Sequence, residues 1–228
     1  MRTHATPDAE LELVHQQARS IEYRDLGGLA YSFKGVVDRL AAALLLVLLA
    51  VPILVITVLI KLSSPGPAFL RQVRVGRFGR PFTAYKFRSM LPDAELLRDE
   101  LEDQNRHDAP TIFKMRQDPR VTRIGRFIRR TSLDELPQLF NVLRGEMSLV
   151  GPRPPLPREV VHYQPHDLQR LAATPGMTGL WQVRGRSEIE FEEMVNIDLE
   201  YIDNWSLWLD LKIIAQTPIA VVGGRGAW

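Results

Sequence analysis

The chain contains no cysteine among its 228 residues. Disulfide bonds, thiolate catalysis and zinc sites built on cysteine are therefore excluded. Charged residues are also absent from one long run, Leu40 to Ile60, in which Thr57 is the only polar side chain. The length is enough for one domain of ordinary size, or for one domain together with an anchor.

The uncharged run from residue 40 to residue 60 predicts a membrane helix. Its roughly 21 residues would reach about 31 Å as a helix, which matches the hydrocarbon core of a bilayer. A soluble helix of this length would need a polar face, and the run has none. Pro52 lies just past its middle, and a proline at that place predicts a bend.

The flanks of the run decide how the helix meets the membrane. Lys34 and Arg39 precede it, and Lys61 and Arg71 follow it, so both flanks are basic. Because positive charge favours the cytoplasmic side, a straight span would leave one basic flank outside. We therefore expect a re-entrant helix over residues 34–62 that returns to the cytoplasmic face of the membrane. A spanning helix with an incidental proline kink stays the alternative.

The remaining pattern predicts an α+β fold that is predominantly helical. We expect residues 1–33 to form a polar N-terminal segment and residues 63–228 to form the domain that carries the candidate site. A short β-hairpin is expected between Phe69 and Phe87, where short alternating stretches flank two glycines. Helices are expected over residues 93–105, 122–130, 132–143, 158–173, 188–201 and 205–222, with a glycine-rich loop over residues 174–186. The last helix begins with two tryptophans, which suits an amphipathic helix at the membrane interface or, equally, a plain buried helix.

The segment from Ser132 to Phe140 carries the candidate site, and it has two interpretations. Ser132 and Glu135 have the spacing of a helix capping box, and Asp134 would suit the positive end of the helix. A helix N-terminus is also a natural phosphate site. The arginines that could join it are Arg126, Arg129 and Arg130 upstream, Arg153 in a rigid proline turn, and Arg184 and Arg186 in a glycine-rich loop.

The second interpretation predicts phosphate chemistry. Guanidinium groups suit bidentate phosphate binding, and a carboxylate among them is expected to stay ionised at neutral pH. Asp134 could then attack phosphorus, while Glu135 could hold Mg²⁺ on a diphosphate. A different class of protein, a membrane-anchored adaptor that binds acidic lipid or nucleic acid without turnover, would use the same arginines. That alternative leaves the order of the sequence motifs unexplained.

Those motifs identify a resemblance. The chain resembles the bacterial sugar transferases, which are monotopic polyprenyl-phosphate phosphoglycosyl transferases. The blocks that carry the resemblance are 34–38, 85–90, 131–144, 148–154, 175–186 and 209–213, in the family's order. The family often has Ser-Pro at the helix bend, where this chain has Val51-Pro52. The chain looks like the small form of the family.

The resemblance implies a ping-pong transfer of a sugar 1-phosphate from a nucleotide-sugar, UDP-linked by family habit, to undecaprenyl phosphate. It implies Asp134 as the nucleophile and Glu135 as the Mg²⁺ ligand. It also implies substrate contacts from Arg129, Arg153, Arg186, Lys86 and Arg88. The expected location is the cytoplasmic face of the bacterial inner membrane, in contact with lipid and without nucleic acid. A homodimer and a direct one-step transfer stay open, and the sugar is not identified.

Overall fold

The computed structural model describes residues 7–24, 26, 28–91, 94, 118–185 and 189–222. These residues are mostly helical and contain two small two-stranded sheets, so the predicted fold class is confirmed in this respect. In chain order the elements are α1 (Pro7–Arg19), α2 (Gly28–Leu48), α3 (Ala50–Ser63), β1 (Phe69–Val75), η1 (Arg77–Gly79), β2 (Pro81–Phe87), α4 (Arg123–Arg130), η3 (Leu133–Gln138), α5 (Leu139–Arg144), β3 (Ser148–Val150), α6 (Pro157–Val160), α7 (Pro165–Leu168), η4 (Gln169–Ala172), β4 (Gly176–Thr178), α8 (Leu180–Arg184), α9 (Phe191–Asp203) and α10 (Leu207–Val222). The helix expected over residues 93–105 lies outside the described residues.

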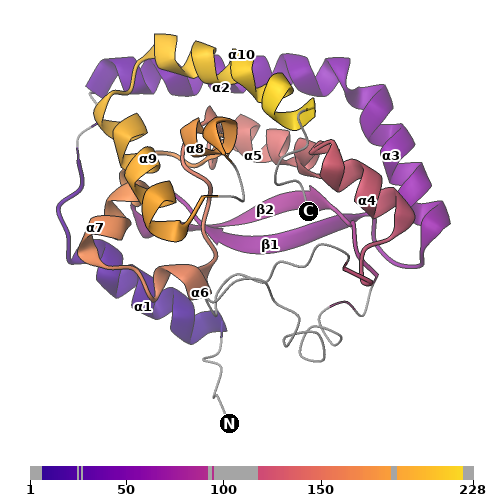
Figure 1. Ribbon diagram of the computed structural model, residues 1–228, viewed down its shortest axis with the longest axis horizontal. Coiled ribbons are helices and arrows are strands. Elements are labelled where there is room, and N and C mark those ends of the chain that lie inside the picture. The colour runs from indigo at the N-terminus through magenta and orange to yellow at the C-terminus, as the bar shows by residue number, and fades with distance from the viewer. Residues whose placement is uncertain are drawn as a thin grey trace.

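The predicted hairpin is confirmed. Strands β1 and β2 pair antiparallel, from Phe69 opposite Phe87 to Val75 opposite Pro81. Gly79, with φ of +76°, turns the chain at the tip, and a side chain there would collide with Ala18 of α1. The hairpin therefore lies in the middle of the molecule, with α1 against its tip and helices above it (Figure 1).

Two of the predicted helices and the predicted loop are wrong in detail. Residues 158–173 form three short pieces rather than one helix, because Pro165 lacks the donor that a continuing helix needs and begins α7 instead. Pro137 similarly accompanies a 3₁₀ turn, η3, ahead of the short α5. The expected loop over 174–186 contains β4 and α8, and β4 pairs parallel with β3. Strands of three residues are too short to show alternation.

The run predicted to enter the membrane forms a bent pair of helices. Helices α2 and α3 meet at Leu49 with a bend of 62°. Pro52 lies in the first turn of α3, where its ring displaces the carbonyl four residues earlier, at the end of α2. Within the described part of the chain, no unbroken helix has the length and hydrophobicity to cross a bilayer, and this bent pair alone meets that test.

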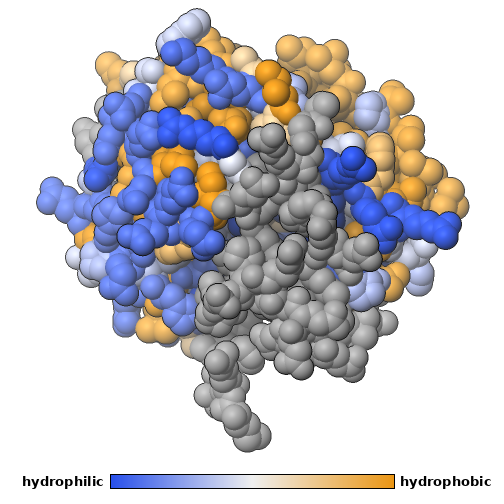
Figure 2. All heavy atoms as spheres, in the orientation of Figure 1, coloured by the Kyte–Doolittle hydropathy of each residue, from blue (hydrophilic) through white to orange (hydrophobic). Residues whose placement is uncertain are grey.

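Both arms of the bent pair also pack on the domain. Ile56 and Ile60 of α3 join Phe87 and Ile128 in one buried cluster, so α3 lies against the hairpin end and α4. The buried Ala42 of α2 packs on α5 in a second cluster. The opposite faces of both helices are exposed and apolar, and Figure 2 shows hydrophobic residues at the top and right of the molecule, where Figure 1 places α2, α3 and α10.

Candidate active site

The 3₁₀ turn η3 presents Asp134 and Glu135. On its inner side, Leu133 and Leu136 pack against the cluster that contains α3 and α4. Ser132 precedes the turn in the left-handed conformation, with φ of 55°, and this sharp corner separates η3 from α4. The two carboxylates therefore lie just after the basic helix α4, and the apolar contact of η3 with α3 fixes their position.

The capping-box interpretation of this segment is wrong. Ser132 makes no side-chain cap hydrogen bond. Glu135 does not reach back toward it, because its Oε1 accepts a hydrogen bond from Lys86 Nζ of β2 at 2.5 Å. A charge-assisted bond of this kind is stronger than a bond to a neutral backbone amide. The left-handed conformation of Ser132 also differs from the extended backbone that a capping residue adopts.

Fixed cations surround Glu135. A small cavity of about 30 Å³ lies beside it. Its charged lining comes from β1, β2, η3 and the proline turn after β3, and contains Arg74, Lys86, Glu135 and Arg153. Three cations thus face one carboxylate, and this arrangement favours a ligand with further negative charge.

Arg74 is a site residue that sequence reasoning did not single out. It is buried in β1, and it donates to Gln72 Oε1 at 2.7 Å and to the carbonyl of Pro154 at 2.9 Å. Burial, followed by the charge of Arg153, lowers the pKa of Arg74 to about 10, so it stays protonated at neutral pH. Strand alternation places residues 72 and 74 on one face, and this was the signal available in the sequence.

The two adjacent carboxyl groups have opposite pKa shifts. Burial, and then the neighbouring charge of Glu135, raise the pKa of Asp134 to about 6, against the lowering effect of Lys86 and Arg129. Burial would also raise the pKa of Glu135, but the charge and hydrogen bond of Lys86, helped by Arg153 and Arg74, hold it below its usual value. At pH 7 Asp134 is still about nine-tenths ionised. Environment therefore separates the roles of the two carboxylates.

The pair also fits a divalent cation on a phosphate ligand. The described residues contain no group of three or more His, Cys, Asp or Glu side chains that could cage a metal. Mg²⁺ needs only one or two protein carboxylates when phosphate oxygens and water complete its shell. Glu135 is ionised and its side chain is 34% exposed, so it is suited to that use, although Lys86 competes for one of its oxygens.

The structure separates the other predicted contacts into three groups. Lys86 and Arg153 line the cavity beside Glu135, and the charge of Arg129 acts on Asp134. Arg88 is buried, and it donates to the carbonyls of Ser64 at 2.8 Å and Pro65 at 2.6 Å, which fixes the turn after α3. Arg186 lies outside the described residues. The role of each of these residues toward substrate stays a prediction.

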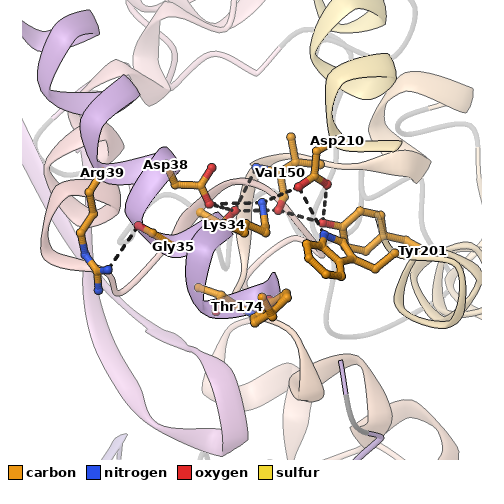
Figure 3. A network of polar contacts seen from close by, with 11 residues as sticks. Lys34, Gly35, Asp38, Arg39, Val150, Thr174, Tyr201 and Asp210 are labelled. Atoms are coloured by element: carbon orange, nitrogen blue, oxygen red, sulfur yellow. Dashed lines mark hydrogen bonds and ion pairs between the residues drawn. The ribbon is translucent and has the colours of Figure 1, made fainter. Parts of the chain in front are cut away.

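Sequence blocks far apart in the chain meet in a second polar cluster. Lys34 of α2 lies 2.7 Å from Asp210 of α10 and 3.2 Å from Asp38. Asp38 accepts from Ser148 Oγ at 2.6 Å, and Asp210 accepts from Tyr201 OH at 2.8 Å (Figure 3). This buried cluster ties α2 and α10 to β3. It therefore accounts for three of the motif blocks through packing rather than through contact with Asp134.

The geometry defines a candidate anion-binding site: two adjacent carboxylates lie among cations, on a turn that packs against an apolar bent helix. Comparison with known proteins then identifies the family. The chain belongs to the bacterial sugar transferase family, whose sequence model matches residues 29–224. The resemblance found in the sequence is thereby confirmed.

Several relatives of the chain carry descriptive names. The galactosyl transferase CpsE of Streptococcus agalactiae is 52% identical over 163 residues, which cover 71% of this chain and 36% of the relative. The undecaprenyl-phosphate galactose phosphotransferase of Salmonella typhimurium is 43% identical over 83% of this chain and 40% of its own length. The exopolysaccharide production protein ExoY of Rhizobium meliloti is 39% identical over 90% of this chain and 91% of its own length. The chain thus spans less than half the length of the first two relatives.

Proposed function

We propose that this chain transfers a sugar 1-phosphate from a UDP-sugar to undecaprenyl phosphate at the cytoplasmic face of the bacterial inner membrane. The products are undecaprenyl-diphosphate-sugar and UMP, which is a first membrane step in exopolysaccharide or capsule synthesis. The names of relatives support the substrate class, since they include undecaprenyl-phosphate galactose and glucose phosphotransferases. The observation that carries the proposal is the Asp134–Glu135 pair, set among Lys86 and Arg153 and packed on α3.

In the first step an oxygen of the Asp134 carboxylate attacks the phosphorus that bears the sugar. The phosphorus–oxygen bond to the uridine monophosphate group breaks, and UMP leaves with the bonding electrons. The raised pKa of Asp134 makes its carboxylate a better nucleophile than an exposed aspartate, while most of it is still ionised at pH 7. Lys86 and Arg153 stand where they can neutralise the charge that develops on the phosphate oxygens.

In the second step a phosphate oxygen of the lipid acceptor attacks the same phosphorus. The bond to the Asp134 oxygen breaks, and the carboxylate is restored. This step needs the acceptor phosphate beside η3, and the exposed apolar faces of the surrounding helices support a position at the headgroup layer. The exposed apolar residues on these faces include Leu40, Leu44, Val51, Leu54, Leu62, Trp208, Leu211 and Ile219.

Glu135, with Asp134 beside it, would hold Mg²⁺ on the donor diphosphate, where the ion would neutralise charge and orient the phosphorus. Lys86 then has a double task, since it keeps Glu135 ionised and lies within reach of the same phosphate oxygens. The remaining contribution of the protein is positioning. The apolar contact between η3 and α3 fixes the nucleophile, and Arg74 holds the proline turn that carries Arg153.

The nucleophile is tested by covalent labelling. The purified chain is incubated with Mg²⁺ and UDP-galactose or UDP-glucose that carries ³²P in the sugar-linked phosphate, without lipid acceptor. We expect label on the wild-type protein, none on Asp134→Asn, and undiminished label on Asp203→Asn, an exposed carboxylate of α9. Full transfer activity in Asp134→Asn would rule out the assignment.

The order of the steps is tested by initial rates. Varying both substrates should give parallel reciprocal plots if the aspartyl intermediate forms, whereas intersecting plots would favour direct transfer with the carboxylates serving only the metal. A panel of UDP-sugars, scored by UMP release in the presence of undecaprenyl phosphate, identifies the sugar. Galactose and glucose come first in that panel, because both appear in the names of relatives.

A further inference from the structure

A second cavity, far larger than the one beside Glu135, lies on the other side of the hairpin tip. Its volume is about 600 Å³, and no residue of its lining belongs to the smaller cavity. Its walls are α2, the hairpin turn with the start of β2, and the loop between α5 and β3. The ionisable residues in these walls are Tyr31, Lys34, Asp38, Arg39, Arg77, Arg80, Arg144 and Glu146.

Cations dominate this cavity even more than the residue types suggest. Both carboxylates are already engaged, since Asp38 accepts from Ser148 Oγ at 2.6 Å and Glu146 accepts from Asn141 Nδ2 at 2.7 Å. Arg39, Arg80 and Arg144 are exposed, and Arg144 is held in place by a hydrogen bond from its Nη1 to Tyr85 OH at 2.9 Å. The walls therefore present guanidinium groups to an incoming ligand.

A fourth arginine gives the cavity a rigid back wall. Arg77 donates from Nε to the carbonyl of Ala172 at 2.8 Å. Its guanidinium carbon lies 4.7 Å from the ring centre of Tyr31 and 4.5 Å from that of Phe78. Stacking of this kind fixes the side chain, so its charge is already placed before a ligand arrives.

The third wall depends on a glycine. Gly145 ends α5 with φ of +78°, and any side chain there would collide with the guanidinium of Arg39. Arg39 can therefore lie across the gap from α2 to the loop after α5. Its Nη1 donates to the carbonyl of Gly35 at 3.2 Å, and Figure 3 shows it pointing away from the buried cluster around Lys34.

The position of Arg39 indicates the source of the ligand. It is the last charged residue before the uncharged run, and the next residue, Leu40, is 67% exposed. With α2 placed at the membrane surface as proposed above, Arg39 lies where the helix passes from headgroups to hydrocarbon. A phosphate in the headgroup layer would be within reach of the cavity.

We propose that this cavity binds the phosphodiester headgroup of an anionic membrane lipid, in the phosphatidylglycerol class. Guanidinium groups of Arg39, Arg80 and Arg144 would pair with the phosphate oxygens, and the acyl chains would follow the apolar face of α2. The proposal rests on the membrane placement in the proposed function. It adds a lipid site distinct from the one at which the acceptor reacts.

The test uses the full chain in a non-ionic detergent and dihexanoyl-phosphatidylglycerol, a water-soluble lipid, in a calorimetric titration. We expect saturable binding to one site. Arg39→Gln combined with Arg80→Gln should weaken this binding about tenfold or more. The variant with lysine at both positions should keep most of the affinity, which separates loss of charge from loss of fold.

Lys61→Gln is the matched control, because Lys61 is an exposed cation at the other flank of the uncharged run. It should leave binding within about twofold of wild type, as expected for a surface charge outside the cavity. An equal loss in Lys61→Gln would reduce the effect to general charge attraction and overturn the proposal.

Two further ligands distinguish the possible sources of phosphate. Dihexanoyl-phosphatidylcholine, which has no net charge, should bind clearly more weakly, and inorganic phosphate or UMP should not displace the anionic lipid. Displacement by UMP at similar affinity would make the cavity a site for soluble phosphates and would overturn the lipid assignment. The covalent labelling of Asp134 is measured on the same variants, so a failure of this inference is seen separately from a failure of the proposed function.

Discussion

Lys86 has two interpretations that a single substitution can separate. As a substrate contact it would act on the phosphate directly. As the partner of Glu135, 2.5 Å from its Oε1, it would act through the ionisation of the carboxylate pair. Lys86→Gln removes the charge while keeping a polar side chain of similar length.

The structure gives the direction of the second effect. Lys86 lowers the pKa of both Asp134 and Glu135, so its removal raises both. Loss of an adjacent opposite charge raises the pKa of a carboxyl group by at least about one unit, and a rise of this size is expected for Asp134. The ionised fraction at pH 6 then falls from about one half to about one tenth, whereas at pH 8 it stays above about nine tenths.

The assay is the rate of covalent sugar-phosphate labelling, measured from pH 5.5 to pH 8.5. We expect Lys86→Gln to move the acid limb of the profile upward by about one unit, with a loss of about fivefold at pH 6 that is nearly recovered at pH 8. Lys61→Gln should leave the limb in place. A loss of the same factor at every pH would refute the electrostatic reasoning and assign Lys86 to the substrate.

Three further predictions concern stability. Asp134 has a folded pKa of about 6, above its unfolded value of 3.8, so ionisation costs stability progressively between these two values and in full above pH 6. Asp134→Asn should therefore raise the free energy of unfolding by about 1–2 kcal/mol at pH 7.5 and by less at pH 5, as measured by denaturant titration. Asp198→Asn should lower the free energy of unfolding by about 3–5 kcal/mol in the same assay, because it leaves the buried Arg170 guanidinium, which lies 2.6 Å from Asp198, without its counter-charge. An apolar replacement of both residues should recover most of this stability. Gly125→Ala should cost about 1–3 kcal/mol, because the new methyl group would collide with the carbonyl of Ser89, and an unchanged thermal midpoint would contradict that contact.

The sequence predicted the larger elements of the fold because their signals were long or sharply bounded. The hairpin follows from alternating stretches on either side of two glycines, and the bend follows from Pro52 in an apolar run. The parallel pair β3–β4 could not be predicted, since each strand has three residues and its register depends on close approach of backbone. A side chain on Gly176 would collide with the backbone at Gly151, and such a contact exists only in three dimensions.

The sequence singled out most residues of the candidate site, but it did not predict their contacts. The proximity of Asp134 and Glu135 to cations could be expected from arginines clustered along the chain. The choice of Lys86 rather than Ser132 as the partner of Glu135 could not, because it depends on β2 lying beside η3. Arg88 was grouped with Lys86 from the same block, yet β2 ends at Phe87, and Arg88 beyond it bonds to the turn after α3 while Lys86 bonds to Glu135. Arg74 was overlooked because its burial arises from the proline turn that follows β3.

The fold couples the Asp134–Glu135 pair to both arms of the bent helix through apolar contacts. Leu133 and Leu136, on either side of the reactive pair, pack in the same cluster as Ile56 and Ile60 of α3. The other arm, α2, holds α5, which continues directly from η3. Because the bend after Leu48 sets the angle between these two arms, it also sets the position of the segment between them. In the proposed mechanism, the nucleophile that serves a water-soluble donor and a lipid acceptor in turn is thereby fixed by the same helices whose outer faces are apolar.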